Sequence, residues 1–324
     1  MPGVAIVQQA PVFLDRAATL AKAVVAIDEA AQAGARLIVF PEAFVPGYPA
    51  WILRLRPGGD MGLSERLHSL LRANAVSLAG DDLAPLREAA RRREVSVVCG
   101  VHELDADFSR ATLYNTVVTI GPDGALLNRH RKVMPTSPER MVWGFGDATG
   151  LKPVDTPCGR VGALICWESY MPLARYALYA QGVEIYIAPT YDHGDKWVAT
   201  MQHIGREGGC WVIGCGCAFQ GRDIADGFSA NAELYRDPDE WVNPGDSVIV
   251  APGGKIVAGP LHQERGILYA EIDLERVGIA RRSLDVTGHY ARPDLFQLQL
   301  DPRPQAPVHV INGDRPHLPF AELR

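Results

Sequence analysis

The sequence predicts an α/β fold in which a mixed β-sheet carries helices on its outside. Short apolar segments alternate with longer segments of helical periodicity over most of the 324 residues. Two glycine-rich turns, at 121–124 and 252–254, interrupt this alternation and predict antiparallel hairpins, which argue against a purely parallel barrel. A chain of this length can also bury a large core without disulfides or metals.

The first half of the chain supplies five of the expected strands and three helices. Leu20, Val24 and Ile27 recur at helical spacing, and Gly34 suits the left-handed position that follows a helix. Pro41 ends an apolar segment that has the β-branched composition of a strand. We expect strands at 4–8, 36–40, 95–101, 113–120 and 125–128, and helices at 15–33, 64–78 and 83–93.

The second half continues the same alternation. We expect strands at 161–165, 183–188, 211–215, 248–250, 255–258 and 266–272, and helices at 172–181, 196–208 and from Asp273 onward. Residues 220–247 show little periodicity and are too many for an ordinary loop. Because this segment contains Phe228, Tyr235 and Trp241, we expect it to cover the functional site or to take part in assembly.

Composition excludes several classes of protein. Hydrophobic residues make up 47% and charged residues 22%, which is typical of a globular protein, and the net charge is −6. No basic block is present to follow a phosphate backbone, so we expect no nucleic-acid partner. No apolar segment approaches the roughly 18 residues of a membrane span. The N-terminus has no basic segment before its first strand, so we expect no signal peptide and a cytoplasmic protein.

The six cysteines are expected to be reduced thiols, because a disulfide framework belongs to small exported chains. Cys210, Cys215 and Cys217 cluster in one apolar segment. They form no CxxC pair and have no nearby pair of histidines, so we expect no metal site there.

Cys166 ends the apolar segment 161–165 and precedes a helix whose first turn tolerates Pro172. A thiol between a strand and a helix N-terminus lies near backbone N–H groups and the positive end of the helix dipole. This setting is expected to lower the thiol pKa and to favour the nucleophilic thiolate. A buried structural cysteine fits the same stretch equally well.

Carboxylates and a lysine provide the other candidates for chemistry. Glu42 follows the apolar strand before Pro41, and burial there is expected to raise its pKa toward that of a useful base. Lys132 stands beside Val133 and is a candidate for a fixed cation, and Glu139 follows it. Taken singly, each of these residues also fits an exposed charge on the surface.

Three segments taken together change this interpretation. Phe40–Phe44, His130–Thr136 and Leu164–Glu168 resemble, in order and spacing, the signature segments of the nitrilase superfamily of carbon–nitrogen hydrolases. The resemblance extends over nearly the whole chain. Segments 135–140, 144–147, 166–168 and 289–294 look like those of true nitrilases rather than amidases or carbamoylases. Ser169 departs from the pattern, since many nitrilases carry asparagine at this position.

The resemblance implies a four-layer α-β-β-α sandwich with two mixed sheets, formed by a single domain at 1–300 and followed by a tail at 301–324. It implies that Cys166 is the nucleophile, Glu42 the general base and Lys132 the cation, with Glu139 positioning both. Lys132 and the backbone N–H of Trp167 would hold charge that develops on the substrate. No metal or organic cofactor is implied, because the nitrile carbon is already electrophilic.

The family likeness also implies the substrate pocket and the assembly. Its walls are expected to include Tyr48, Trp167, Tyr191 and His193, although ordinary packing explains each of them equally well. Nitrilases commonly form dimers that stack into spirals, so we expect a homo-oligomer to which segment 220–247 and the tail contribute.

Other functions remain open on the sequence alone. Within the superfamily the alternatives are an amidase, a carbamoylase or a cyanide-hydrolysing enzyme. A non-catalytic protein of the same fold would not need Glu42, Lys132 and Cys166 at three strand ends. A thiol redox protein would need a resolving cysteine, for which the sequence shows no CxxC pair.

Overall fold

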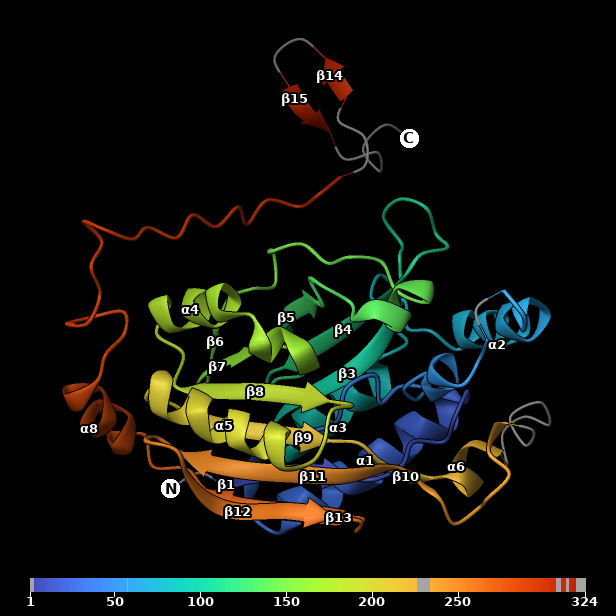
Figure 1. Cartoon of the computed structure of the whole chain (residues 1–324), viewed down its shortest axis with the longest axis horizontal. Coiled ribbons are helices and arrows are strands. Elements are labelled where there is room, and N and C mark those ends of the chain that lie inside the picture. The colour runs from blue at the N-terminus through green and yellow to red at the C-terminus, as the bar shows by residue number, and fades with distance from the viewer. Residues whose placement is uncertain (1–2, 57, 226–233, 307–309, 313–314, 319–324) are drawn as a thin grey trace.

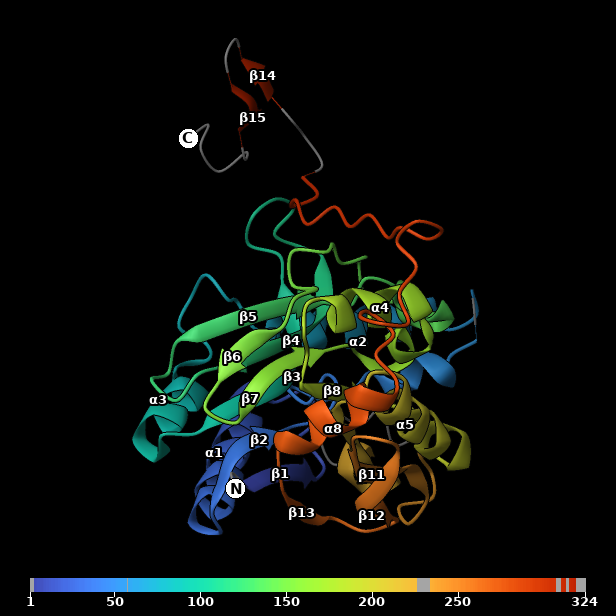
Figure 2. The ribbon, with the colours of Figure 1, turned by 90° about the vertical axis from the view of Figure 1, so that its left-hand side faces the viewer.

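Two β-sheets face each other at the centre of the molecule, and helices cover their outer faces (Figures 1 and 2). The structure is a computed structural model that describes residues 3–56, 58–225, 234–306, 310–312 and 315–318. Both sheets contain parallel and antiparallel neighbours. The predicted α/β class, with two mixed sheets in an α-β-β-α sandwich, is confirmed.

The first sheet has the strand order β13-β1-β2-β3-β4-β5. Neighbours β1, β2 and β3 are parallel, and the other pairs are antiparallel. The predicted hairpin at 121–124 connects β4 to β5, and β4 has the bounds that its apolar sequence predicts. The strands are β1 Gly3–Gln8, β2 Ala35–Val39, β3 Ser96–Leu104, β4 Leu113–Ile120, β5 Leu126–Arg131 and β13 Gly266–Glu271.

The second sheet has the order β10-β11-β9-β8-β7-β6, with β12 also paired to β11. Strands β7, β8 and β9 are parallel, and β6 and β11 run antiparallel to their neighbours. The strands are β6 Val154–Thr156, β7 Gly159–Ala163, β8 Ile185–Thr190, β9 Trp211–Gly216, β10 Ala218–Gln220, β11 Trp241–Ala251 and β12 Lys255–His262.

Helices lie on both sides of this pair of sheets. Helices α1 and α3 share a hydrophobic cluster with the first sheet, and α4 and α5 share one with the second. At α1, the Asp15 side chain accepts the Ala18 N–H at the N-terminus, and Gly34 follows the C-terminus with a φ of +96°. The helices are α1 Arg16–Gln32, α2 Met61–Ala73, α3 Ala84–Arg93, α4 Pro172–Ala180, α5 Asp195–Glu207, α6 Gly221–Ala225 and α8 Glu275–Ser283.

Alternation along each strand separates the layers. On β1, Ala5 and Val7 face the helices, whereas Val4 and Ile6 face the second sheet. Ile187 of the second sheet belongs to the same inter-sheet cluster as Val4 and Ile6. Each fully buried side chain of this size contributes about 1.5–3 kcal/mol through removal from water, so the inter-sheet cluster holds the two sheets together firmly.

The segment 220–247 has more regular secondary structure than its weak periodicity indicates, and its expected role in covering the site or in assembly stays a prediction. Its first residue, Gln220, ends β10, and α6 follows directly. The segment ends within β11, which starts at Trp241 and pairs with β9, β10 and β12. Pro244 and Gly245 interrupt the apolar alternation of β11, which is why sequence periodicity missed the first part of the strand. Tyr235 is buried and contributes to a hydrophobic cluster at one end of the sheets, while Phe228 lies outside the described residues.

Beyond α8, residues 284–306 are mostly exposed. Two short strands, β14 Val310–Asn312 and β15 Arg315–Leu318, form a separate two-stranded sheet, and Figures 1 and 2 show it standing away from the two large sheets. Among the described residues, no helix combines the length and the apolar character that a bilayer span requires.

Candidate active site

The candidate residues meet where several strands end. Glu42 follows β2, Lys132 follows β5 directly and Cys166 follows β7. The end of β8 adds Thr190, and Tyr191 comes next. Strands β2 and β5 belong to the first sheet and β7 and β8 to the second. Because the two sheets pack face to face, the carboxyl ends of these strands place their polar groups together.

Lys132 is the centre of this cluster. Its Nζ donates to Glu42 Oε1 at 2.8 Å, and to Glu139 Oε2 at 2.8 Å and Oε1 at 3.0 Å. The side chains of Lys132 and Glu42 have no exposed surface. Burial alone would lower the pKa of Lys132, but Glu42, Cys166 and Glu139 raise it above the ordinary value. The lysine therefore remains a cation that two carboxylates hold in place.

Glu42 accepts hydrogen bonds at both carboxylate oxygens. Besides Lys132, its Oε1 accepts the Asn115 side-chain amide at 2.7 Å, and its Oε2 accepts the backbone N–H of Tyr191 at 2.7 Å. Burial and the negative charge of Glu139 raise the pKa of Glu42, and Lys132 opposes that rise. The direction agrees with the prediction and is the one that a general base requires.

Glu139 lies in the first turn of the short 3₁₀ helix η2, Ser137–Met141, which follows the Lys132 loop. Its Oε2 accepts the backbone N–H of Thr136 at 2.7 Å, as in a helix capping box. Its Oε1 accepts the hydroxyl of Tyr48 at 2.7 Å. Glu139 therefore joins Lys132 to the loop after β2.

Cys166 is the first residue of a second 3₁₀ helix, η3 Cys166–Tyr170, and has a φ of +54°. Non-glycine residues rarely adopt this left-handed conformation, and such strain is concentrated at functional sites. The side chain is 4% exposed. The geometry gives Cys166 a sharp turn between β7 and α4, which aims the thiol at the edge where Lys132 and Glu42 lie.

The expected low pKa of Cys166 is wrong. Burial raises the pKa well above the ordinary thiol value, and Glu42 adds to the rise; Lys132 and a hydrogen bond from Thr190 lower it only in part. The helix-terminus argument considered only neighbours in the sequence, whereas the carboxylates come from distant loops. The thiol is therefore neutral at rest, so its reaction requires a base to remove the proton.

The cluster combines a neutral thiol, a base and a fixed cation in a buried site. Two carboxylates and one ammonium titrate as a coupled group, so apparent pKa values belong to the cluster. Such a set can deprotonate a nucleophile and stabilise negative charge that develops on a substrate atom. This is the chemistry of covalent hydrolysis.

The four expected wall residues have different positions. The Tyr48 and Tyr191 rings stack, with centroids 3.9 Å apart, beside the cluster. Trp167 is 52% exposed, and its indole N–H donates to Asp192 at 2.9 Å. His193 is exposed, and its backbone N–H donates to Asp192 at 2.9 Å. Substrate contact by these four residues stays a prediction.

Sequence reasoning missed Asn115 and Thr190. Asn115 lies in β4 and Thr190 ends β8, so each belongs to a strand that carries no recognised motif. The available signal was weak, because it consisted of one amide in a strand that is otherwise mostly apolar.

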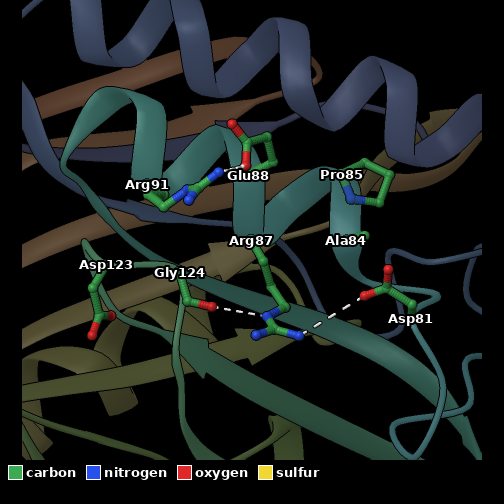
Figure 3. Close-up of a pocket in the computed structure, with 8 residues that line it drawn as sticks. All are labelled: Asp81, Ala84, Pro85, Arg87, Glu88, Arg91, Asp123 and Gly124. Atoms are coloured by element: carbon green, nitrogen blue, oxygen red, sulfur yellow. Dashed lines mark hydrogen bonds and ion pairs between the residues drawn. The ribbon is translucent and has the colours of Figure 1, made fainter.

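A surface hollow elsewhere on the molecule is a poor candidate for catalysis. It lies between α3 and the β4–β5 turn, and Figure 3 shows Arg87 directed at Asp81 and Arg91 directed at Glu88, with Asp123 apart from them. Arg87 donates to Gly124 O and pairs with Asp81, while Arg91 pairs with Glu88. Apart from Asp123, its charged side chains are thus already paired with one another on open surface. In the described part of the chain, no His, Cys, Asp or Glu residues group in a way that would hold a metal ion.

Comparison with known proteins agrees with this geometry. A carbon–nitrogen hydrolase family profile matches residues 3–282. Nitrilase 3 of Arabidopsis thaliana is 41% identical over 94% of this chain and 88% of its own length. The chain belongs to the carbon–nitrogen hydrolase family. An aliphatic nitrilase of Sinorhizobium fredii is also 41% identical, over 94% of this chain and 97% of its own length.

Two further comparisons concern function and fold in this hydrolase family. A bifunctional nitrilase/nitrile hydratase of Nicotiana tabacum is 40% identical over 94% of this chain and 87% of its own length. The crystal structure of Saccharomyces cerevisiae Nit3, a member of branch 10 of the nitrilase superfamily, covers 89% of this chain and 96% of its own. Its TM-score is 0.70 at 23% identity, which establishes a shared fold.

Proposed function

We propose that the protein is a nitrilase, which hydrolyses an organic nitrile to a carboxylic acid and ammonia. The observation that carries the proposal is the buried Glu42–Lys132–Glu139 cluster beside Cys166, at hydrogen-bond distances of 2.8–3.0 Å around Lys132 Nζ. Relatives that are about 40% identical and are named nitrilases support nitriles as the substrate class.

The first chemical step forms a carbon–sulfur bond. Glu42 removes the Sγ proton of Cys166, and the thiolate attacks the nitrile carbon. The nitrile nitrogen gains a proton, and a thioimidate is left on Cys166. Lys132 and the backbone N–H of Trp167 hold the charge that develops on the substrate nitrogen.

Two water molecules complete the reaction. The first, activated by Glu42, adds to the thioimidate carbon, and ammonia leaves as the carbon–nitrogen bond breaks. The second attacks the resulting thioester, which releases the carboxylic acid and returns the proton to Sγ. Glu139 holds Lys132 and, through Tyr48, the loop that carries Glu42. The balance is one nitrile and two waters to one acid and one ammonia.

A side reaction follows from the same intermediate. If the carbon–sulfur bond breaks after the first water has added, an amide leaves in place of ammonia. The bifunctional relative of Nicotiana tabacum favours a test for amide among the products.

The test is ammonia, acid and amide release from a panel of nitriles, the matching amides and cyanide. Wild type should release ammonia from nitriles, and Cys166→Ala should release none. Cys158→Ala is the matched control, since it removes another buried thiol, which lies in the turn between β6 and β7. Turnover of amides alone would move the protein to the amidase branch, turnover of cyanide alone would make it a cyanide hydrolase, and activity in Cys166→Ala would refute the mechanism.

We also propose self-association through the chain that follows α8. The chain after α8 exposes large apolar side chains, with Leu295 61% and Phe296 78% exposed, and such surface usually marks a contact with another chain. Sedimentation should show a dimer or a larger homo-oligomer. A monomer that is fully active at every concentration would contradict this. A location in the cytoplasm stays a prediction.

A further inference from the structure

Glu168 is a buried carboxylate that the proposed mechanism does not use. Its side chain has no exposed surface. One oxygen, Oε2, accepts the backbone N–H of Ile165 at 2.6 Å, and the other, Oε1, accepts the backbone N–H of Val133 at 2.7 Å. Ile165 directly precedes Cys166, and Val133 directly follows Lys132. A single carboxylate therefore connects the backbones of the nucleophile loop and the lysine loop.

The ring of His130 also contacts the Glu168 carboxylate. Its Nε2 lies 3.0 Å from Glu168 Oε2 and 3.3 Å from Oε1, while its Nδ1 is buried and has no hydrogen-bond partner among the residues that the structure describes. Burial would raise the pKa of Glu168, but His130 and the backbone N–H groups of Ile165 and Val133 lower it below the ordinary value. Glu168 is therefore a charged acceptor, and hydrogen bonds to charged acceptors are the stronger class.

The position of Glu168 repeats that of Glu139. Each glutamate lies in the first turn of a short 3₁₀ helix and accepts the backbone N–H of the residue that precedes that helix. Glu139 also accepts a hydrogen bond from the Lys132 ammonium, whereas Glu168 accepts one from the backbone N–H of Val133, next to Lys132. The side chain and the backbone of the lysine are thus fixed by two separate carboxylates.

We propose that Glu168, oriented by His130, is a positioning residue that sets the spacing between the Cys166 thiol and the Lys132 ammonium. The inference rests on the proposed function, because it takes Cys166 as nucleophile and Lys132 as the stabilising cation. Neither group touches the substrate. Their effect is on geometry, and a misplacement of about 1 Å between reacting groups costs about 100-fold in rate.

Glu168→Gln tests the spacing with little change in volume. An amide has one oxygen, so either the Ile165 or the Val133 N–H loses its acceptor. We expect kcat for nitrile hydrolysis to fall by roughly 10- to 100-fold with KM little changed. Alkylation of Cys166 by iodoacetamide should also slow, because Lys132 favours the thiolate and would no longer be held at the same distance.

Two further variants separate positioning from folding. His130→Phe keeps both backbone hydrogen bonds and removes the ring N–H, so its loss of kcat should be smaller than that of Glu168→Gln. Glu184→Gln is the control, because Glu184 accepts the backbone N–H of Arg160 at 2.8 Å. This contact lies where β7 and β8 begin, at the opposite end from Cys166. That variant should keep wild-type kcat and wild-type alkylation of Cys166.

The outcomes are distinct. Wild-type kcat and Cys166 alkylation in Glu168→Gln would overturn the inference, as would a loss of kcat that only follows the loss of folded protein. If Glu168→Gln does not fold, wild-type kcat and alkylation in His130→Phe would overturn it. A wild-type protein that releases no ammonia from any nitrile would refute the proposed function instead, and the alkylation rates would still test the spacing.

Discussion

Lys132→Met should destabilise the protein and abolish its activity, with a pH dependence that identifies the cause. The substitution removes the only cation that contacts the two buried carboxylates Glu42 and Glu139, as far as the described residues show. Breaking a buried ion pair by removing one partner costs about 3–5 kcal/mol. With about 2.1 cal/mol/K of unfolding entropy per residue, this loss lowers Tm by ~4–7 °C.

The pH dependence follows from Glu42, whose pKa burial raises and Lys132 lowers. Without Lys132 the folded-state pKa rises further above the value in the unfolded chain. A carboxyl with a raised pKa costs no stability below its unfolded pKa, and the cost grows as pH rises toward its folded pKa. The destabilisation of Lys132→Met relative to wild type should therefore be larger at pH 8 than at pH 5.

Thermal unfolding at the two pH values measures the effect, and ammonia release measures activity. Lys22→Met is a control, since in the described part of the chain Lys22 donates one hydrogen bond, to Ala10 O at 2.6 Å, outside the cluster. The double variant Glu42→Gln/Lys132→Met removes one charge of each sign, so it should regain stability but no activity. Equal Tm losses at both pH values, or activity in either Lys132 variant, would refute the reasoning.

Three other changes test the surroundings of Glu42 and Glu139. Asn115→Ala removes a 2.7 Å hydrogen bond to a charged acceptor, which is worth about 1.5–3 kcal/mol, and steady-state kinetics should show a fall of about 10-fold or more in kcat. Tyr48→Phe removes the hydroxyl bound to Glu139 and should lower kcat and Tm, whereas unchanged values of both would remove Tyr48 from the network. The pH profile of kcat/KM should fall on the acid side, at a higher pH than an ordinary glutamate gives, because the raised pKa of Glu42 leaves the base protonated there. A profile that stays flat down to pH 4 would contradict that role.

Local chemistry made much of the fold predictable. The apolar strand 113–120 and the turn at 121–124 carry their own signals, and the structure has both. The register that brings β2, β5, β7 and β8 to a shared edge depends on packing between two sheets, and no local signal encodes it. For the same reason β11 was only partly predicted. Pro244 and Gly245 interrupt its strand pattern in the sequence, and pairing with neighbouring strands keeps these residues in the sheet.

The candidate site was likewise predictable where a local motif marks it and unpredictable where it depends on tertiary contacts. Glu42, Lys132, Glu139 and Cys166 lie in segments that resemble a family, so their grouping was expected. Asn115 could not be found from the sequence, because its role depends on a contact across 73 positions of the chain. The direction of the Cys166 pKa was wrong for a related reason, since burial and distant carboxylates outweigh its neighbours in the sequence.

The most direct measurement of the central claim is the mass of the enzyme during turnover. Wild type mixed with a nitrile and quenched in acid should carry an added substrate mass on the peptide that contains Cys166. The same peptide of Cys166→Ala should carry none, while Cys158→Ala should behave as wild type. An adduct on another residue, or nitrile turnover by Cys166→Ala, would contradict the assignment of Cys166 as the nucleophile.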